Sequence, residues 1–300
     1  SFIPIVVAAV IATTVGRGLT GDVAAFDSIP EYSLGSPAEY PFYIVLGLIT
    51  GFAAAIFIRL LNFFETNIEK MEMVPVPFRT CLGGLCVGLI ALSFPHVLGN
   101  GFGVTSDLIS LDTNEKGALI MGDSFPDGMD VSTGISSLLV FVISIMILKI
   151  IATSVSIGSG GSGGIFTPSL FIGAALGAAL GLVLNDMGIV EHPGAFALVG
   201  MAAFVASTTR ATLTAIVLLF EMTATYEIIL PLMLSCVVAD AVCFVVSEHS
   251  CYTAKLARRG INIDLGAEQD LMRMIKVEEA MTSEVMTITH QRTLEVARQM

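Results

Sequence analysis

The sequence is short of charged residues. Asp, Glu, Lys and Arg make up only 13% of its 300 residues, whereas a soluble domain carries about 25%. Apolar residues make up 54% of the chain. Too few polar side chains are present to cover a water-exposed surface of this size, which excludes a wholly soluble protein. We therefore expect lipid to surround most of the chain.

Basic residues and zinc or carboxylate motifs are also scarce. The net charge of −12 argues against a nucleic-acid partner, although acidic loops between apolar segments account for much of it. No apolar segment holds a His-Glu-x-x-His motif or paired carboxylates at helical spacing. The sequence therefore does not favour a membrane-embedded enzyme, and no cofactor or metal is predicted for the apolar region.

Cysteine is rare as well, and the five that occur lie within or beside apolar segments. We expect them to be small core hydrophobes rather than disulfide partners or metal ligands. The chain opens on Ser1 with neither Met nor a basic stretch, so no cleavable signal peptide is predicted. It is expected to be a piece of a longer protein. The cysteines are Cys81, Cys86, Cys236, Cys243 and Cys251.

Apolar runs dominate what is present. A run of about 20 residues is enough to cross a bilayer. Two of the runs, 195–207 and 211–222, are too short to do so, and half-spanning helices survive only where protein or a water-filled path satisfies their ends. A pair of such half-spanning helices is typical of transport folds. The remaining runs cover residues 2–19, 41–61, 78–98, 134–157, 165–184 and 228–246.

The few charges predict an orientation and a domain boundary. Residues 22–39 and 107–130 are acidic, whereas Lys70, Arg79 and the end at Lys255 and Arg258 are basic. The positive-inside rule places the basic ends in the cytoplasm. Charges become frequent only after Arg259, so we expect a membrane domain over residues 1–260 and a linker over 261–276.

Residues 158–168 read Gly-Ser-Gly-Gly-Ser-Gly-Gly-Ile-Phe-Thr-Pro and lie between two apolar runs. Such a stretch cannot continue a helix without a large cost, so the backbone must unwind there. The helix that follows begins with unpaired N–H groups and a positive dipole end, which glycine lets an anion approach. The N–H groups of Ile165 and Phe166 are the predicted donors. A glycine-rich helix crossing without a ligand is the alternative.

The same stretch also resembles the signature of a known protein family. The run from Lys149 to Gly181 contains GSGGSGGIFTPSLFIGAALGAALG and resembles the signature of the CLC family of chloride channels and chloride/proton exchangers. The resemblance continues, in the same order, over most of the apolar region. It includes PHVLGNGFG at residues 95–103, Gly200-Met201, Arg210-Ala211, Glu221-Met222-Thr223, Tyr226, Leu230-Pro231 and Ser250-Cys251-Tyr252-Thr253-Ala254.

The resemblance implies an all-α polytopic fold in which this chain is the second of two inverted repeats, with tilted and half-spanning helices. It implies a homodimer with one pore in each subunit, in a plasma or bacterial inner membrane. It also implies a chloride site formed by Gly164, Ile165, Phe166 and the hydroxyl of Tyr252, with protons as possible co-substrates. Without the resemblance, Tyr252 would be interpreted as an interfacial aromatic residue.

Other implications stay open. The family's serine ligand and its two glutamates do not occur here and are expected upstream of Ser1, so channel and exchanger remain alternatives. Nitrate or fluoride transport, or a non-conducting nucleotide-sensing module, are further alternatives. Residues 277–300 resemble the start of a cytoplasmic α/β CBS domain, which would allow an adenine nucleotide to bind.

The sequence also gives expectations for single charged residues and for the dimer surface. Glu221 is interpreted as a helix-terminal acid and Arg210 as structural, whereas Lys149 and Asp240 receive no role. In the family, the dimer interface uses the first helix of this chain and the two that begin near Ala211 and Ile228. The apolar side chains expected there are Ile216, Leu219, Ile229 and Leu232.

Overall fold

The computed structural model describes residues 2–21, 26, 39–70, 74–113, 119–120, 135–223 and 226–258. Within these ranges the chain is helical apart from two short strands, as predicted. β1 (Asp112–Thr113) and β2 (Leu119–Ile120) pair antiparallel in a connection between helices. The helices are α1 (Phe2–Thr20), α2 (Tyr40–Glu69), α3 (Val76–Ser93), the 3-10 turn η2 (Pro95–Val97), α4 (Phe102–Ile109), α5 (Ile135–Gly158), α6 (Phe166–Asp186), α7 (Pro193–Thr209), α8 (Thr212–Thr223), α9 (Ile229–Val246) and α10 (Thr253–Arg258).

Most helices begin and end close to the predicted apolar runs, with two differences. α2 continues past Leu61 to Glu69, because polar residues on one face do not stop a helix whose other face still packs. The short helix α4 was not predicted as a separate element; it starts after Gly101, whose φ of +77° turns the chain after η2. α2, α5, α6 and α9 are long and apolar enough to cross a membrane.

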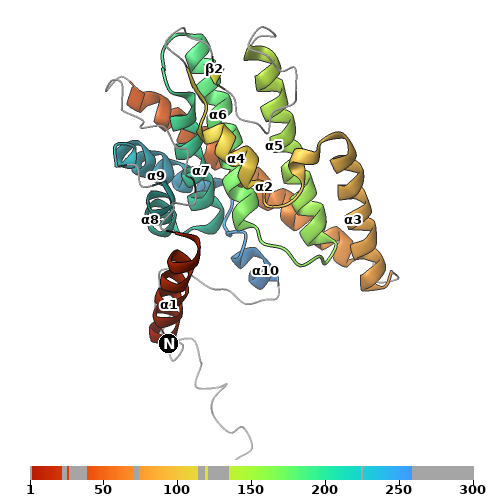
Figure 1. Cartoon of the computed structure of the whole chain (residues 1–300). Coiled ribbons are helices and arrows are strands. Elements are labelled where there is room, and N and C mark those ends of the chain that lie inside the picture. Colours follow the sequence, from red (N-terminus) through yellow and green to blue (C-terminus); the bar gives the residue numbers. More distant parts are fainter. Residues whose placement is uncertain are drawn as a thin grey trace, which may run out of the picture.

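α6 and α7 form the centre of the molecule, with α3 and α5 on one side of them and α8 and α9 on the other (Figure 1). Their main chains meet at glycines spaced four residues apart on α6. A Cβ built on Gly173 would lie 2.5 Å from the carbonyl oxygen of Gly200, and one on Gly177 would lie 2.0 Å from that of Phe196. Only glycine permits this approach, as expected for helices that associate in lipid.

α7 explains how a helix too short for the bilayer is tolerated. It has 17 residues, a length of about 26 Å, and is longer than the predicted run of 195–207. All its residues from Pro193 to Thr208 are buried. A helix that is apolar all round is a core helix, so α7 is surrounded by protein rather than by lipid. α8 has 12 residues, or about 18 Å, and packs against α7 and α9.

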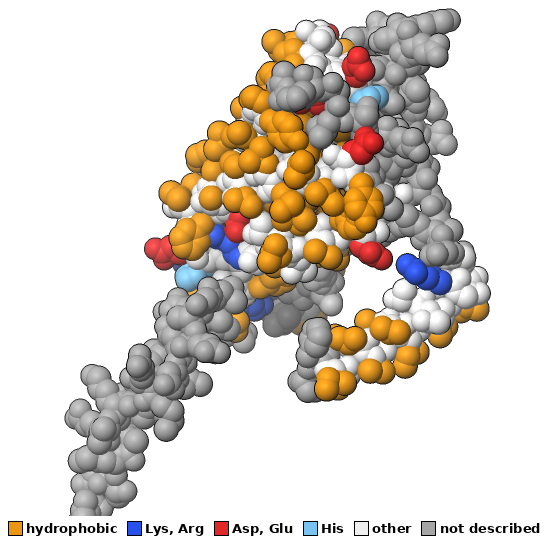
Figure 2. Space-filling view, turned by 90° about the vertical axis from the view of Figure 1, so that its left-hand side faces the viewer, with side chains coloured by type: hydrophobic (Ala, Val, Ile, Leu, Met, Phe, Trp, Pro, Cys, Tyr) orange, Lys and Arg blue, Asp and Glu red, His pale blue; other side chains and the backbone are white. Residues whose placement is uncertain are grey.

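The outer surface is apolar. α1 stands apart from the other helices with its side chains exposed, and Figure 2 shows a broad hydrophobic face on the body of the molecule. An apolar surface of this extent is compatible with lipid and not with water. Exposed apolar side chains of α8 and α9 include Leu213, Val217, Leu230, Met233, Val237, Phe244 and Val245.

The structure corrects the side chains expected at the dimer surface. Ile216, Leu219 and Leu232 are buried in the chain's own core, and Ile229 is half-buried. These side chains face α7 and its neighbours because the same helices must also bury one face inside the subunit. The linker 261–276, the proposed CBS segment 277–300 and most of the acidic loops lie outside the described residues.

Candidate functional site

The glycine-rich stretch that follows α5 ends this helix abruptly. Gly160 has a φ of +90°. Its N–H donates to the carbonyl of Ile157 at 3.1 Å, and the N–H of Gly161 donates to that of Ser156 at 3.0 Å. This is the hydrogen-bond pattern of a Schellman C-cap with glycine in the left-handed position. The helix therefore stops after Gly158 for a local reason, as the glycine content predicts.

Two neighbouring helices hold this loop from the side. A Cβ on Gly158 would lie 3.1 Å from the main-chain nitrogen of Glu65 in α2. Ser159 is buried against α3, where a Cβ on Gly83 would lie 2.2 Å from its Oγ. Thr80, also in α3, donates its hydroxyl to the carbonyl of Ser159 at 3.0 Å. The loop is thus packed against α2 and α3.

The first turn of α6 presents unpaired main-chain donors. The first helical bond runs from Ser169 N–H to the carbonyl of Ile165 at 3.0 Å, and Ile165 has no side-chain cap. Within the described part of the chain, the N–H groups of Gly164, Ile165 and Phe166 have no protein acceptor. Gly164 is exposed, and a Cβ added to it would meet no atom within 4 Å, so the space beside this residue is open.

Tyr252 lies just before α10, in a segment tied to the end of α7. Cys251 N–H donates to the carbonyl of Thr208 at 3.0 Å. Ser250 and Thr253 cap each other: Ser250 N–H donates to Thr253 Oγ1 at 2.9 Å, and Thr253 N–H donates to Ser250 Oγ at 3.1 Å. The Tyr252 side chain is 51% exposed. Partial burial, followed by the effect of Cys251, raises the pKa of its hydroxyl, which remains a donor at neutral pH.

The loop and the Tyr252 segment meet at one hydrophobic cluster. Ile165 packs, partly buried, against a cluster that also contains the buried Cys251, the residue next to Tyr252. α2 supplies much of this cluster, and α5, α6, α7 and α9 contribute one buried side chain each. Its other buried members are Ala54, Ala55, Phe57, Ile58, Leu61, Ile150, Ile172, Phe204 and Cys243.

An ion pair that the sequence analysis missed lies beside this cluster. Lys255 Nζ is 2.7 Å from Glu65 Oε1, and the Glu65 side chain is only 8% exposed. The predicted run 41–61 ended before Glu65, so this acid was not expected in the protein interior. The signal that could have found it is an isolated acid one helical turn beyond an apolar run that has no stop residue.

Three other charges have structural contacts. Lys149 is buried and donates to the carbonyls of Val97 and Gly99 at 2.8 and 2.9 Å. Arg210 donates to the carbonyl of Cys243 at 3.1 Å and lies 3.7 Å from the Asp240 carboxylate. These contacts agree with the structural role expected for Arg210 and show what Lys149 and Asp240 bind.

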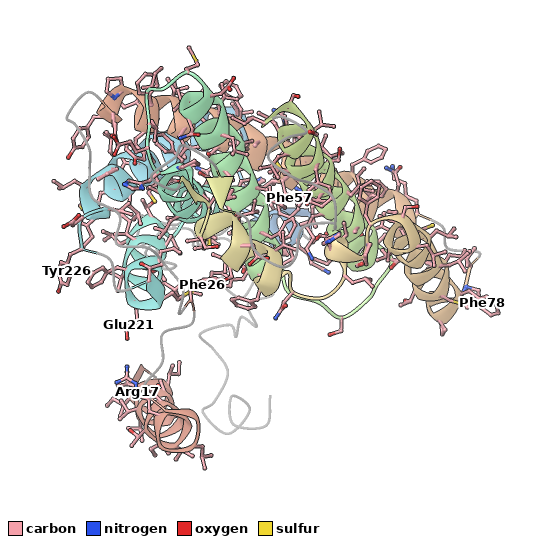
Figure 3. The ribbon with its side chains drawn as sticks, turned by 45° about the horizontal axis from the view of Figure 1, so that its top comes forward. Arg17, Phe26, Phe57, Phe78, Glu221 and Tyr226 are labelled. Atoms are coloured by element: carbon pink, nitrogen blue, oxygen red, sulfur yellow. The ribbon has the colours of Figure 1, made fainter. Side chains whose placement is uncertain are left out.

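Glu221 lies at the surface near the end of α8. Its side chain is 76% exposed and 3.9 Å from Arg17 of α1, and Figure 3 shows the two residues facing each other. The position agrees with a helix-terminal acid. Among the described residues, no three His, Cys, Asp or Glu side chains are grouped to hold a metal ion.

The cysteines divide into two groups. Cys236, Cys243 and Cys251 are buried in the core as expected, whereas Cys81 and Cys86 in α3 are exposed. The expectation that all five are core residues is therefore wrong for α3, whose outer face carries apolar side chains that no other described helix covers. All five are free thiols.

Known proteins resemble this arrangement. The chain is 38% identical over 240 residues to the chloride channel protein CLC-f of Arabidopsis thaliana, covering 76% of this chain and 28% of that protein. It is 32% identical over 257 residues to the putative chloride channel protein ClcB-like of Ralstonia nicotianae, covering 85% and 54%.

A solved structure has the same fold. A slow cyanobacterial Cl⁻/H⁺ antiporter matches with a TM-score of 0.60 and 28% identity, covering 83% of this chain and 53% of that one. The chain therefore spans about half the length of this antiporter and of the bacterial relative, and less of the plant one. The family model described as voltage-gated chloride channel matches residues 1–243, and the chain accordingly belongs to the CLC family of membrane channels and transporters.

Proposed function

We propose that this chain supplies one half of a chloride pathway, in which the N–H groups of Ile165 and Phe166 and the hydroxyl of Tyr252 bind the ion. Gly164 provides the space through which the ion approaches the main chain. The protein that contains the chain would move chloride across the membrane as a channel or a chloride/proton antiporter. A second subunit, as a homodimer, would contact the exposed faces of α8 and α9.

The observation that carries the proposal is the unpaired start of α6. Three successive N–H groups, on the exposed Gly164 and the half-buried Ile165 and Phe166, have no protein acceptor and lie at the positive end of a helix dipole equivalent to about half a charge. These donors can replace part of the water that a chloride ion loses on entry. The absence of Lys or Arg from residues 158–168 suits an ion that must also leave.

Tyr252 adds a donor from a separate part of the chain. Its segment and the start of α6 contact the same hydrophobic cluster, which makes a shared ion geometrically reasonable. The hydroxyl is neutral, so it contributes one hydrogen bond without the strong attraction of a fixed cation. This combination of weak donors supports transport rather than storage of the anion.

The test is anion efflux from liposomes that contain the full-length protein, with external pH recorded at the same time. Chloride efflux coupled to proton uptake by the vesicles would identify an antiporter, and efflux without proton movement a channel. If a folded protein passes no chloride under either an anion gradient or a pH gradient, the proposal is wrong. Parallel measurements with nitrate and fluoride define the selectivity.

A further inference from the structure

We propose that Glu65 and Lys255 are positioning residues that hold the two parts of the anion site in register. Glu65 contacts Gly158, the last residue of α5 before the glycine-rich loop, through its main chain and α10 through its side chain. It therefore connects the segment that carries Ile165 and Phe166 to the segment that carries Tyr252. This inference rests on the proposed function, because it assigns these residues a role at the same site.

The ion pair is well placed to fix α10. The 2.7 Å separation of Lys255 Nζ and Glu65 Oε1 is that of a charge-assisted hydrogen bond. The Glu65 side chain is 8% exposed and that of Lys255 is 51% exposed. A buried carboxylate needs a partner far more than a half-exposed ammonium does. The acid in α2 therefore determines where Lys255 must lie.

The main chain of Glu65 fixes the loop. A Cβ on Gly158 would lie 3.1 Å from both the nitrogen of Glu65 and the carbonyl carbon of Phe64, so α2 and the end of α5 are in direct main-chain contact. Only a few residues separate Gly158 from the free N–H groups at the start of α6. A shift of this turn of α2 would consequently move the loop as well.

α10 depends on such contacts for its orientation. It has six residues, and a helix of this length has little stability of its own. Lys255 follows Tyr252 by about one helical turn, so the rotation that brings Lys255 to Glu65 also sets the direction of the Tyr252 side chain. The bond from Cys251 to Thr208 and the buried side chains of Cys251 and Ala254 hold one side of the segment against the protein, and the ion pair of Lys255 adds a further fixed point.

The consequence is a dependence of chloride affinity on a pair that does not touch the ion. An ion held by donors from two segments binds best when both reach it at once, and a small displacement of one segment loses its hydrogen bond. Glu65 and Lys255 carry opposite charges, so removing both leaves the local net charge unchanged. An effect of the double change on affinity would therefore come from position and not from a lost electrostatic attraction.

The experiment is chloride titration calorimetry on the purified full-length protein, with Glu65→Gln/Lys255→Met in the presence and absence of Tyr252→Phe. We expect the double change to lower chloride affinity about tenfold, roughly the loss of one hydrogen bond to a charged group. In the Tyr252→Phe background we expect less than about a twofold further loss, because two changes that act on one contact are not additive. The swapped pair Glu65→Lys/Lys255→Glu is expected to recover part of the affinity.

Glu221→Gln is the matched control, since it makes the same chemical change at an exposed carboxylate and should leave affinity unchanged. If the double variant does not fold, Glu65→Gln/Lys255→Gln, which also leaves the local net charge unchanged, provides the same comparison. The inference is overturned if the pair variants bind chloride like the unsubstituted protein. It is equally overturned if they lose as much affinity in the Tyr252→Phe background, since the effect would then not pass through Tyr252.

The same titration gives a different result if the proposed function is wrong. In that case the unsubstituted protein binds no chloride, and Tyr252→Phe makes no difference. Chloride binding that weakens with Tyr252→Phe but not with the pair variants leaves the proposed function standing and removes only the role of Glu65 and Lys255.

Discussion

Arg210 ends α7 and joins it to the end of α9. It has a φ of +61°, a left-handed conformation that is uncommon for a residue with a side chain. Its guanidinium binds the carbonyls of Cys243 and Ser247, lies near Asp240 and stacks 5.0 Å from the ring centroid of Phe244. The contacts compensate for the local conformation, and one side chain secures two helix ends.

Replacing Arg210 with Met is expected to destabilise the protein. It would leave the Asp240 carboxylate without its cation and remove the guanidinium bonds to the carbonyls of Cys243 and Ser247. We expect a loss of about 2 kcal/mol, below the usual cost of breaking a buried pair because Asp240 is partly exposed. The measurement is the thermal unfolding midpoint in detergent. Adding Asp240→Asn should recover part of the loss, and Arg17→Met at an exposed pair should cost little; equal losses for Arg17 and Arg210 would contradict this account.

Tyr252 permits a test of a single donor. Tyr252→Phe keeps the ring and removes only the hydroxyl, so a folded protein with lower anion affinity is expected. A hydrogen bond to a charged group contributes about 1.5–3 kcal/mol, or roughly a tenfold to hundredfold change in chloride dissociation constant. Chloride titration calorimetry measures it. Tyr226→Phe is a suitable control, because Tyr226 is exposed near the end of α8. An unchanged affinity would remove Tyr252 from the site.

Of the helices, α6 and α7 depend most on the close approach of their main chains. The glycines of α6 let the carbonyls of α7 come nearer than any side chain would allow. This contact begins at Gly173, about two turns after the start of α6, so the position of the helix that carries the free donors depends on it. Gly84 and Gly88 of α3 are different, because a Cβ added to either would meet no atom within 4 Å.

A pair of alanine substitutions separates these two kinds of glycine. Gly177→Ala places a methyl group 2.0 Å from the Phe196 carbonyl, and we expect a loss of about 1–3 kcal/mol as α6 and α7 move apart. Gly88→Ala meets no atom within 4 Å and should stabilise α3 by up to about 1 kcal/mol through its greater helix propensity. Thermal unfolding of both variants measures the difference, and similar midpoints would show that the α6–α7 contact is looser than described.

For the whole molecule, the ion pair between Lys255 and Glu65 brings the end of α2 and α10 to the same side. The start of α6 lies near them, and α6 then runs for 21 residues, or about 32 Å, to Asp186. The turn after α6 is therefore on the opposite side. The positive-inside prediction assigned the ends at Lys70 and Lys255 to one compartment, and this geometry agrees with that pairing.

The orientation is testable by labelling introduced cysteines in a variant with Cys81→Ser and Cys86→Ser. Membrane-impermeant maleimide should reach Lys70→Cys only from the cytoplasm and Met187→Cys only from outside, since both positions are exposed on opposite ends of the bundle. The buried Cys236, Cys243 and Cys251 should remain unlabelled in the parent variant. Labelling of both introduced cysteines from the same side would contradict the arrangement.

The sequence by itself determined the helical membrane class, most helix positions and the break after Gly158. These depend on local properties: apolar length, glycine content and the left-handed conformation at Gly160. It also indicated Ile165, Phe166 and Tyr252 as candidates, the last only through family resemblance. Their role in binding remains a prediction.

Tertiary structure alone decided which face of each helix is covered and which distant segments meet. Ile216, Leu219 and Leu232 were expected at a dimer surface and are buried, because an all-apolar helix carries no pattern that distinguishes lipid from protein. Glu65 and Lys255 are far apart in the chain and become partners only when α2 and α10 pack together. A contact of this kind depends on the three-dimensional arrangement of the helices, which spacing along the sequence does not encode.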